Sequence, residues 1–254
     1  MTRLNAVREG QGPVVVLSHA LGCDLHMWDD VAPLLAASHT VIRYDHRNHG
    51  GSERVPGPMT MQMLAQDAAD LIAQEAGGQP VHFVGLSMGG MTAQALAVLR
   101  PELLASVVIA NSSAHYPDQA PWQARVATVR AQGVAAVADG AVARWLTPEF
   151  VATPEGAAAA GRLRETLLRN DADSYIAACE GVAAIDFRES NRAIRTPTLV
   201  IAGARDEATP PAMSEQIAQA ISGARLVTVD AAHISAVERP GEFARALRDF
   251  LVSV

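Results

Sequence analysis

The run VHFVGLSMGGMTAQALAVL, residues 81–99, joins an apolar stretch typical of a buried β-strand to a helical pattern through a G-x-S-x-G turn. Ser87 stands at the tip of that turn. Such a turn holds its central residue in a backbone conformation that is costly for a residue with a side chain. The small residues Gly85, Gly89 and Gly90 would let the strand and the helix approach closely around it. A G-x-S-x-G motif that joins a buried strand to a helix predicts that Ser87 is a nucleophile.

The start of the predicted helix would assist the chemistry of that serine. Backbone N–H groups from Met88 onward point out of the helix N-terminus, which carries the positive end of the helix dipole. They would stabilise an oxyanion formed beside Ser87, so the N–H of Met88 is a predicted oxyanion-hole donor. A serine hydroxyl also needs a base, and imidazole takes up and returns a proton near neutral pH.

His233 is the best candidate base among the eight histidines. It lies in the loop AAHISAVERP, after the strand pattern ARLVTVD, and α/β folds present reactive groups in loops that follow strands. Asp206 follows another apolar strand, TLVIAG, and could orient the imidazole. The order Ser87, Asp206, His233 is that of α/β-hydrolases rather than of other serine-triad folds. The structural alternatives are a turn residue at Asp206 and a helix-start residue at His233.

Apolar strand patterns alternate with helical segments along the chain, which predicts an α/β fold with a mostly parallel sheet covered on both faces. The expected strands are LNAVREG, VVVLSH, TVIRYD, VHFVGL, LASVVIAN, TLVIAG and ARLVTVD. The alternation stops between residues 114 and 195, where alanine, arginine and glutamate recur at helical spacing. We therefore expect a helical cap, residues 114–195, inserted into a core formed by residues 1–113 and 196–254.

The expected cap contains side chains suited to binding a substrate. Trp122, Trp145 and Arg144 are the predicted substrate-binding residues, and the insertion also holds Arg125, Arg130 and Tyr175. An aromatic and basic lining would suit a small substrate that carries a carboxylate. The alternative is that the tryptophans pack the cap helices together and the arginines face water. The alanine-rich segment 151–162 is expected to be a loop leading into a helix.

The chain resembles the α/β-hydrolase superfamily along nearly its whole length. VVVLSHALGCDLHMWDDVAPLL is similar to the family's oxyanion-loop segment, and RYDHRNHGGS to its Asp-x-Arg-Gly-His-Gly-x-Ser loop. The resemblance implies that the N–H of Leu21 joins that of Met88 in the oxyanion hole, and that His49 braces backbone beside the site. Members usually begin with a longer antiparallel hairpin, so the single strand pattern before VVVLSH implies a shortened N-terminus without the first edge strand.

Within that superfamily, one set of segments is similar to 3-oxoadipate enol-lactonases, which open a small anionic lactone: SHALGCDLHMWD, GLSMGG, ANSSA, RWLTPEF and AAHISAVERP. The resemblance implies a serine hydrolase that works through an acyl-enzyme. The chain departs from the family at Asn48, where glycine is usual, and asparagine tolerates positive φ well. It also has His115 and Tyr116 where an enol-lactonase would carry a basic residue, which weakens the substrate assignment.

Several other functions fit the same motifs. A general carboxylesterase, a C–C bond hydrolase or a perhydrolase of this fold would show the same triad, and only the cap would distinguish them. A ligand receptor without turnover could retain the triad as well. The sequence does not decide among these.

Composition narrows the class of partners. A net charge of −7 and a pI near 5.6 argue against binding to nucleic acid or to an anionic membrane. No apolar stretch is long enough to cross a bilayer, and the start MTRLNAVREGQGP has no signal-peptide pattern, so we expect a cytoplasmic protein. The oligomeric state is left open.

No cofactor and no metal are expected. The chain has no glycine-rich dinucleotide fingerprint after its first strand, and a serine triad needs no metal. Asp45, His46 and His49 could be mistaken for ligands, but they belong to the structural loop named above. Cys23 and Cys179 give no disulfide framework, and we expect Cys23 to fill a small apolar space.

Overall fold

Seven strands form a single sheet in the order β1-β3-β2-β4-β5-β6-β7 in the computed structural model, which describes residues 1–254. The strands are β1 (Ala6–Glu9), β2 (Val14–Ser18), β3 (Thr40–Tyr44), β4 (Val81–Leu86), β5 (Leu104–Ala110), β6 (Thr198–Gly203) and β7 (Arg225–Val229). β1 pairs antiparallel with β3, and every other pairing is parallel. The predicted α/β fold with a mostly parallel sheet is confirmed, and each expected strand is present, with only β1 before β2.

The apolar runs of the central strands follow from burial on both faces of the sheet. Every residue of β4 and β6 is buried, as are all but one of β5. A strand covered on both sides has no solvent face to mark with polar residues, so its sequence is continuously apolar. The edge strands β1 and β7 are largely exposed instead.

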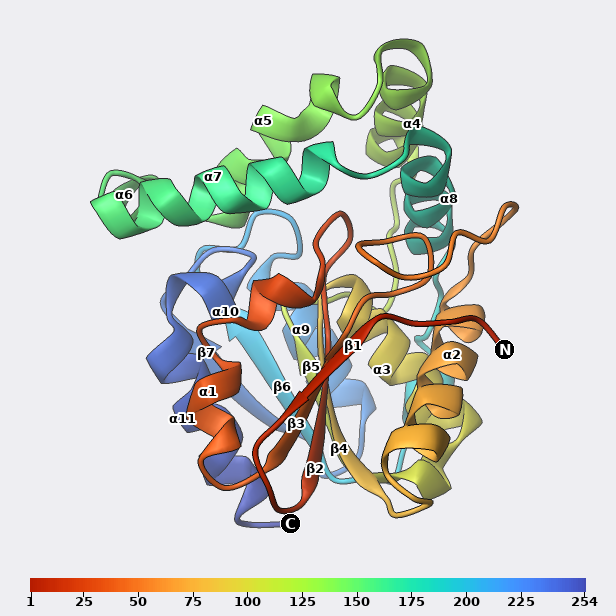
Figure 1. Ribbon diagram of the computed structural model, residues 1–254, viewed down its shortest axis with the longest axis vertical. Helices are drawn as coiled ribbons and strands as arrows, with labels where there is room; N and C mark the ends of the chain where they lie inside the picture. Colours follow the sequence, from red (N-terminus) through yellow and green to blue (C-terminus); the bar gives the residue numbers. More distant parts are fainter.

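Helices cover the two faces of the sheet (Figure 1). α2, α3 and α9 lie on one face, and α1 and α11 on the other. Their bounds are α1 (Ala32–Ala36), α2 (Met61–Glu75), α3 (Met88–Leu99), α9 (Pro211–Ala220), α10 (Ser235–Glu238) and α11 (Pro240–Leu251). Short 3₁₀ helices are η1 (Leu25–Trp28), η2 (Pro101–Leu103) and η3 (Ser190–Ala193). No helix combines the length and the apolar character needed to cross a membrane.

Five helices between β5 and β6 lie together beyond one end of the sheet (Figure 1). They are α4 (Ala120–Gln132), α5 (Ala135–Trp145), α6 (Pro148–Val151), α7 (Pro154–Leu168) and α8 (Ala172–Ala183). Most of the segment 151–162, expected to be a loop, is helical, because Thr153 caps α7 and a proline occupies its first position. We call α4–α8 the cap helices below.

Candidate active site

The turn between β4 and α3 has the geometry that its glycines imply. Ser87 has φ +58° and connects the end of the strand to the start of the helix. A Cβ placed on Gly85 would lie 1.9 Å from the carbonyl oxygen of Gly89, and one placed on Gly89 would lie 2.1 Å from that of Ser18. Only glycine fits at these two positions, so the backbone itself holds the serine in place.

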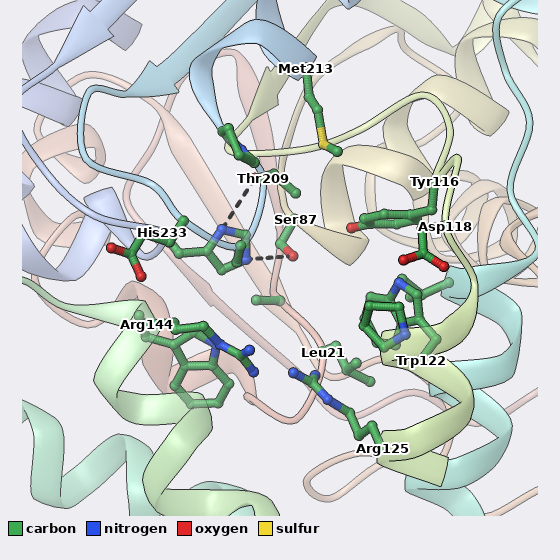
Figure 2. Close-up of a pocket in the computed structure, with 17 residues that line it drawn as sticks. Leu21, Ser87, Tyr116, Asp118, Trp122, Arg125, Arg144, Thr209, Met213 and His233 are labelled. Atoms are coloured by element: carbon green, nitrogen blue, oxygen red, sulfur yellow. Dashed lines mark hydrogen bonds between the residues drawn. The ribbon is translucent and has the colours of Figure 1, made fainter.

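His233 and Asp206 reach Ser87 from the loops after β7 and β6. The Nε2 atom of His233 lies 2.9 Å from Oγ of Ser87, and its Nδ1 atom lies 2.8 Å from Oδ2 of Asp206 (Figure 2 shows the serine and the histidine). All three side chains are buried. Because the carboxylate accepts a hydrogen bond from the Nδ1–H group of His233, the lone pair of Nε2 faces the serine hydroxyl and can take its proton.

The carboxylate of Asp206 is surrounded by donors. Its Oδ1 atom accepts the backbone N–H groups of Ala208 and Thr209, at 2.8 and 2.9 Å. Its Oδ2 atom accepts the hydroxyl of Thr209 and an N–H of Asn111, at 2.8 and 3.1 Å. Burial raises the pKa of Asp206, but His233 and these hydrogen bonds outweigh it and lower the pKa below its usual value. The group therefore stays ionised and can stabilise an imidazolium.

Asn111 supports the site, and we did not predict it. It follows β5 with φ +45°, and its Nδ2 atom also lies 3.3 Å from the carbonyl oxygen of Ala232, the residue before His233. Its Oδ1 atom accepts the hydroxyl of Ser235 at 2.6 Å. The amide thus joins Asp206 to the histidine loop. Its place after a central strand could have identified it, because parallel strands present functional groups at their carboxyl ends.

Glu238 is a second supporting residue that the sequence analysis missed. Its buried carboxylate accepts the N–H of Ala232 at 3.0 Å, the N–H of Thr147 at 3.1 Å and the hydroxyl of Thr147. The N–H of Ile234 donates to the carbonyl oxygen of Trp145 at 2.9 Å. The histidine loop is therefore hydrogen-bonded to the end of α5.

The loop after β2 approaches Ser87 from the other side. Leu21 lines the cavity beside Ser87, and its N–H donates to no acceptor within the protein. The preceding carbonyl, of Ala20, accepts from Nδ1 of His19 at 2.7 Å and from the N–H of Cys23 at 3.1 Å. Met88 is the first residue of α3, where an N–H has no acceptor in its own helix. Both predicted oxyanion donors are thus free, and their catalytic role stays a prediction.

Three buried histidines pack beneath this loop: His19, His46 and His49. The Nε2 atom of His49 accepts the N–H of Gly22 at 3.3 Å, while its Nδ1 atom donates to the carbonyl oxygen of Arg47. Burial, helped by the neighbouring His19, lowers the pKa of His49 to about 4. Burial also lowers the pKa values of His19 and His46. All three imidazoles are therefore neutral near pH 7 and can accept backbone N–H groups.

The other features predicted for this segment also have structural explanations. Asn48 has φ +66°, the conformation expected for a position where the family has glycine. Asp45 accepts the N–H of Leu25 at 2.7 Å, so it fixes loop backbone. Cys23 is buried and does not line the cavity, and burial raises the pKa of its thiol.

A cavity of about 400 Å³ opens in front of Ser87, between the core loops and the cap helices. The predicted substrate-binding residues Trp122, Trp145 and Arg144 all line it. Figure 2 labels Trp122 and Arg144. Arg125 lines it too, with its guanidinium carbon 4.9 Å from the ring centroid of Trp122. Tyr116 packs edge-on against the same tryptophan, with the ring centroids 5.3 Å apart. The cavity therefore combines aromatic walls with two cationic groups, and the carboxylates of Asp118 and Glu207 also line it.

Other cap residues do not face the cavity. Arg130 pairs with Glu180 on the exposed surface, at 3.5 Å. Tyr175 is fully buried beneath the cap, where its ring lies next to Gly22. His115 forms a β-bridge with Asp186, so of the two residues that depart from the enol-lactonase pattern only Tyr116 lines the cavity.

The sequence and the structure are similar to those of known hydrolases. The alpha/beta hydrolase fold family matches residues 13–240. 3-Oxoadipate enol-lactonase 2 of Acinetobacter baylyi is 36% identical over 247 residues, which cover 96% of this chain and 91% of that protein.

Two solved structures show the same likeness. The enol-lactonase from Burkholderia xenovorans has a TM-score of 0.94 and 35% identity, covering 99% of this chain and 97% of that one. A thermophilic esterase from Thermogutta terrifontis, solved with malate bound, has a TM-score of 0.92 and 27% identity, with coverages of 99% and 94%. These matches, with the fold and the serine turn, show that the chain is a hydrolase that belongs to the alpha/beta hydrolase fold family.

Proposed function

We propose that this hydrolase opens a small anionic lactone of the 3-oxoadipate enol-lactone type, with Ser87 as nucleophile, His233 as base and Asp206 orienting the base. The observation that carries the substrate class is the pair Arg125 and Arg144, whose side chains both line the cavity in front of Ser87. The similarity to enol-lactonases over 96% of the chain supports the same substrate class.

The reaction follows from the hydrogen bonds at Ser87. His233 takes the hydroxyl proton while Oγ attacks the lactone carbonyl carbon, and the N–H groups of Leu21 and Met88 stabilise the oxyanion. The ring C–O bond then breaks, and the imidazolium returns its proton to the enol oxygen. The enol stays on the acyl chain bound to Ser87. Water, activated by His233, then hydrolyses the acyl-enzyme, so one product molecule leaves with the new carboxylic acid and with the enol, which becomes a ketone. Asp206 stabilises the imidazolium at both stages.

Electrostatics in the cavity favour a substrate with a carboxylate. Burial lowers the pKa of Arg144 and the nearby charge of Arg125 lowers it further, while Tyr175 and the carboxylate of Glu207 act in the opposite direction. Both groups remain cationic near neutral pH because an arginine titrates far above it. A carboxylate bound between them would relieve their mutual repulsion, and the faces of Trp122 and Trp145 would cover the apolar part of a small ring. In this proposal, residues 114–195 act as a cap that selects the substrate.

A general carboxylesterase is the second candidate. The thermophilic esterase, at 27% identity and a TM-score of 0.92, favours it, and the cavity would also admit a neutral ester. The two candidate functions differ in whether Arg125 and Arg144 bind the substrate, because only an anionic substrate needs a cationic partner.

The deciding experiment follows hydrolysis of 3-oxoadipate enol-lactone by its ultraviolet absorbance, with 4-nitrophenyl acetate as the neutral comparison and Ser87→Ala as the control. Fast lactone opening that is lost in Ser87→Ala is the expected result. Ester cleavage without lactone opening would retain the triad and favour the carboxylesterase. Binding of the lactone without turnover of either substrate would favour a receptor.

A further inference from the structure

The cap contacts the loop after β2 at Gly22, one residue beyond the predicted oxyanion donor Leu21. Gly22 has φ +75°, and a Cβ placed on it would lie 2.6 Å from Cδ1 of Leu167 and 3.2 Å from Cε2 of Tyr175. Leu167 lies in α7 and Tyr175 in α8. The cap helices therefore pack directly against the backbone of the oxyanion loop, which we define as residues 20–24.

Asn170 adds a hydrogen bond to this contact. Its Nδ2 atom donates to the carbonyl oxygen of Gly22 at 3.1 Å and lies 3.0 and 3.1 Å from the carbonyl oxygens of Thr166 and Leu167. The last two belong to the C-terminal turn of α7, where they also accept the backbone N–H groups of Arg169 and Asn170 at 3.2 and 3.1 Å. Rotating the amide by half a turn would set its oxygen against three carbonyl oxygens, so its orientation is fixed. One carboxamide thus joins the end of α7 to the oxyanion loop.

The core holds the same loop from the opposite side. The N–H of Gly22 donates to Nε2 of His49, and its carbonyl accepts from Asn170. Arg169, beside Asn170, also donates to the largely buried carboxylate of Asp24 at 3.2 Å. Gly22, the residue after Leu21, is therefore hydrogen-bonded to the core through its N–H and to the cap segment through its carbonyl.

We propose that Asn170 is a positioning residue that, through Gly22, directs the N–H of Leu21 toward the oxyanion. Asn170 does not line the cavity in front of Ser87, so it affects the rate of the chemical step without binding the substrate. The inference rests on the proposed function, in which the Leu21 N–H is an oxyanion donor. The inference implies that moving the cap helices away from the oxyanion loop would misdirect the Leu21 N–H and leave the oxyanion hole incomplete.

The test compares Asn170→Ala and Asn170→Ser with wild type on 4-nitrophenyl acetate, a substrate without a carboxylate. Serine keeps a hydroxyl that can bond the carbonyl four residues earlier, at Thr166, but it is too short to reach Gly22. We expect kcat to fall about tenfold or more in both variants with KM nearly unchanged, since losing one oxyanion donor outright costs about 10²–10³-fold. Inhibition by phenylboronic acid, which forms a tetrahedral adduct on serine, should weaken by a similar factor.

Arg162→Ala is the matched control. It removes an exposed ion pair between α7 and Asp30, 3.9 Å long, that does not touch the oxyanion loop. Its kcat should stay within about twofold of wild type, because exposed pairs contribute little. Thermal unfolding of all variants checks that the cap is intact.

Three results would overturn the inference: an Asn170→Ser variant that is folded and keeps full kcat, an effect confined to KM, or equal losses in Arg162→Ala. Activity retained in Ser87→Ala would instead overturn the proposed function itself. The two failures are therefore separate.

Discussion

The serine turn and the outer surface of the cap helices differ in how tightly their backbones are packed. In the turn, residues 81–99, a Cβ on Gly85 would lie 1.9 Å from a backbone oxygen, and Ser87 is held at φ +58°. In the cap, the exposed Gly140 and Gly161 have no atom within 4 Å of a Cβ position, whereas a Cβ on Gly156 would lie 1.9 Å from the carbonyl oxygen of Phe150. The turn therefore permits almost no substitution, and the cap permits substitution on its outer surface but not where its helices pack.

The largest expected effect is the loss of activity when the nucleophile of the serine turn is removed and the cavity beneath the cap is kept. Ser87→Ala should lower kcat for 4-nitrophenyl acetate by about 10⁴-fold or more, with KM little changed, because the variant loses the nucleophile but keeps the cavity. Steady-state kinetics measure this directly. A variant that keeps more than a few per cent of the activity would show that another residue is the nucleophile.

Lowering the pH should reduce the stability of the core before that of the cap. The core contains the buried histidine cluster, whereas His115 is the one histidine of residues 114–195. The folded-state pKa of His49, about 4, lies below the ordinary value of 6.5, so the unfolded chain binds more protons between these values. Its contribution to stability is full above pH 6.5 and is lost as the pH falls toward 4. That loss is about 3 kcal/mol for His49 alone. His19 and His46 act in the same direction.

Urea unfolding at about pH 7 and about pH 4 tests this dependence. His49→Gln should reduce the difference between the two conditions, and His26→Gln, at an exposed position, should leave it unchanged. A stability that does not vary over this range would contradict the neutral, buried state of the cluster.

A glycine-to-alanine substitution should change stability in opposite directions in the serine turn and on the outer surface of the cap. Gly89→Ala should destabilise the protein by about 3 kcal/mol, because its Cβ would lie 2.1 Å from the carbonyl oxygen of Ser18. Gly140→Ala, inside α5, should stabilise it by about 0.5–1 kcal/mol, since alanine is the better helix former. Denaturant unfolding of both variants measures the two shifts. Shifts of the same sign would remove the contrast between turn and cap.

The smallest effect on kinetics concerns substrate choice. Arg144→Ala should raise KM for the anionic lactone about tenfold, the equivalent of one charged hydrogen bond, and leave KM for 4-nitrophenyl acetate nearly unchanged. Arg164→Ala is the control, because this cap arginine pairs with Asp139 on the exposed surface. An equal rise in KM for both substrates would mean that Arg144 only shapes the cavity.

The sequence predicted the serine turn residue by residue, because its determinants are local. The strand pattern, the glycine spacing and the helix all lie within residues 81–99. The cap was harder to predict, because the cavity-facing side of each helix depends on how helices pack. Arg125 faces the cavity, whereas Arg130 lies five residues further along α4, about 140° around the helix, and pairs with Glu180 at the surface.

The supporting residues Asn111, Glu238 and Asn170 were not predicted, for a related reason. Each acts through a hydrogen bond to a residue far away in the sequence. No periodicity or short motif encodes such a partner. The post-strand position of Asn111 was the one local sign available.

The hydrogen bonds between Thr147 and Glu238 determine which segments of the chain could be grafted from one relative onto another. A chimaera whose foreign segment 114–195 had no hydroxyl at position 147 would lose the bond from the Thr147 side chain, and the buried carboxylate of Glu238 would keep only backbone N–H donors. A buried carboxylate short of donors is costly, so the foreign segment would disturb the loop that holds His233. The segment that could be transferred is therefore residues 114–195 together with position 238, although 42 residues of sequence lie between them.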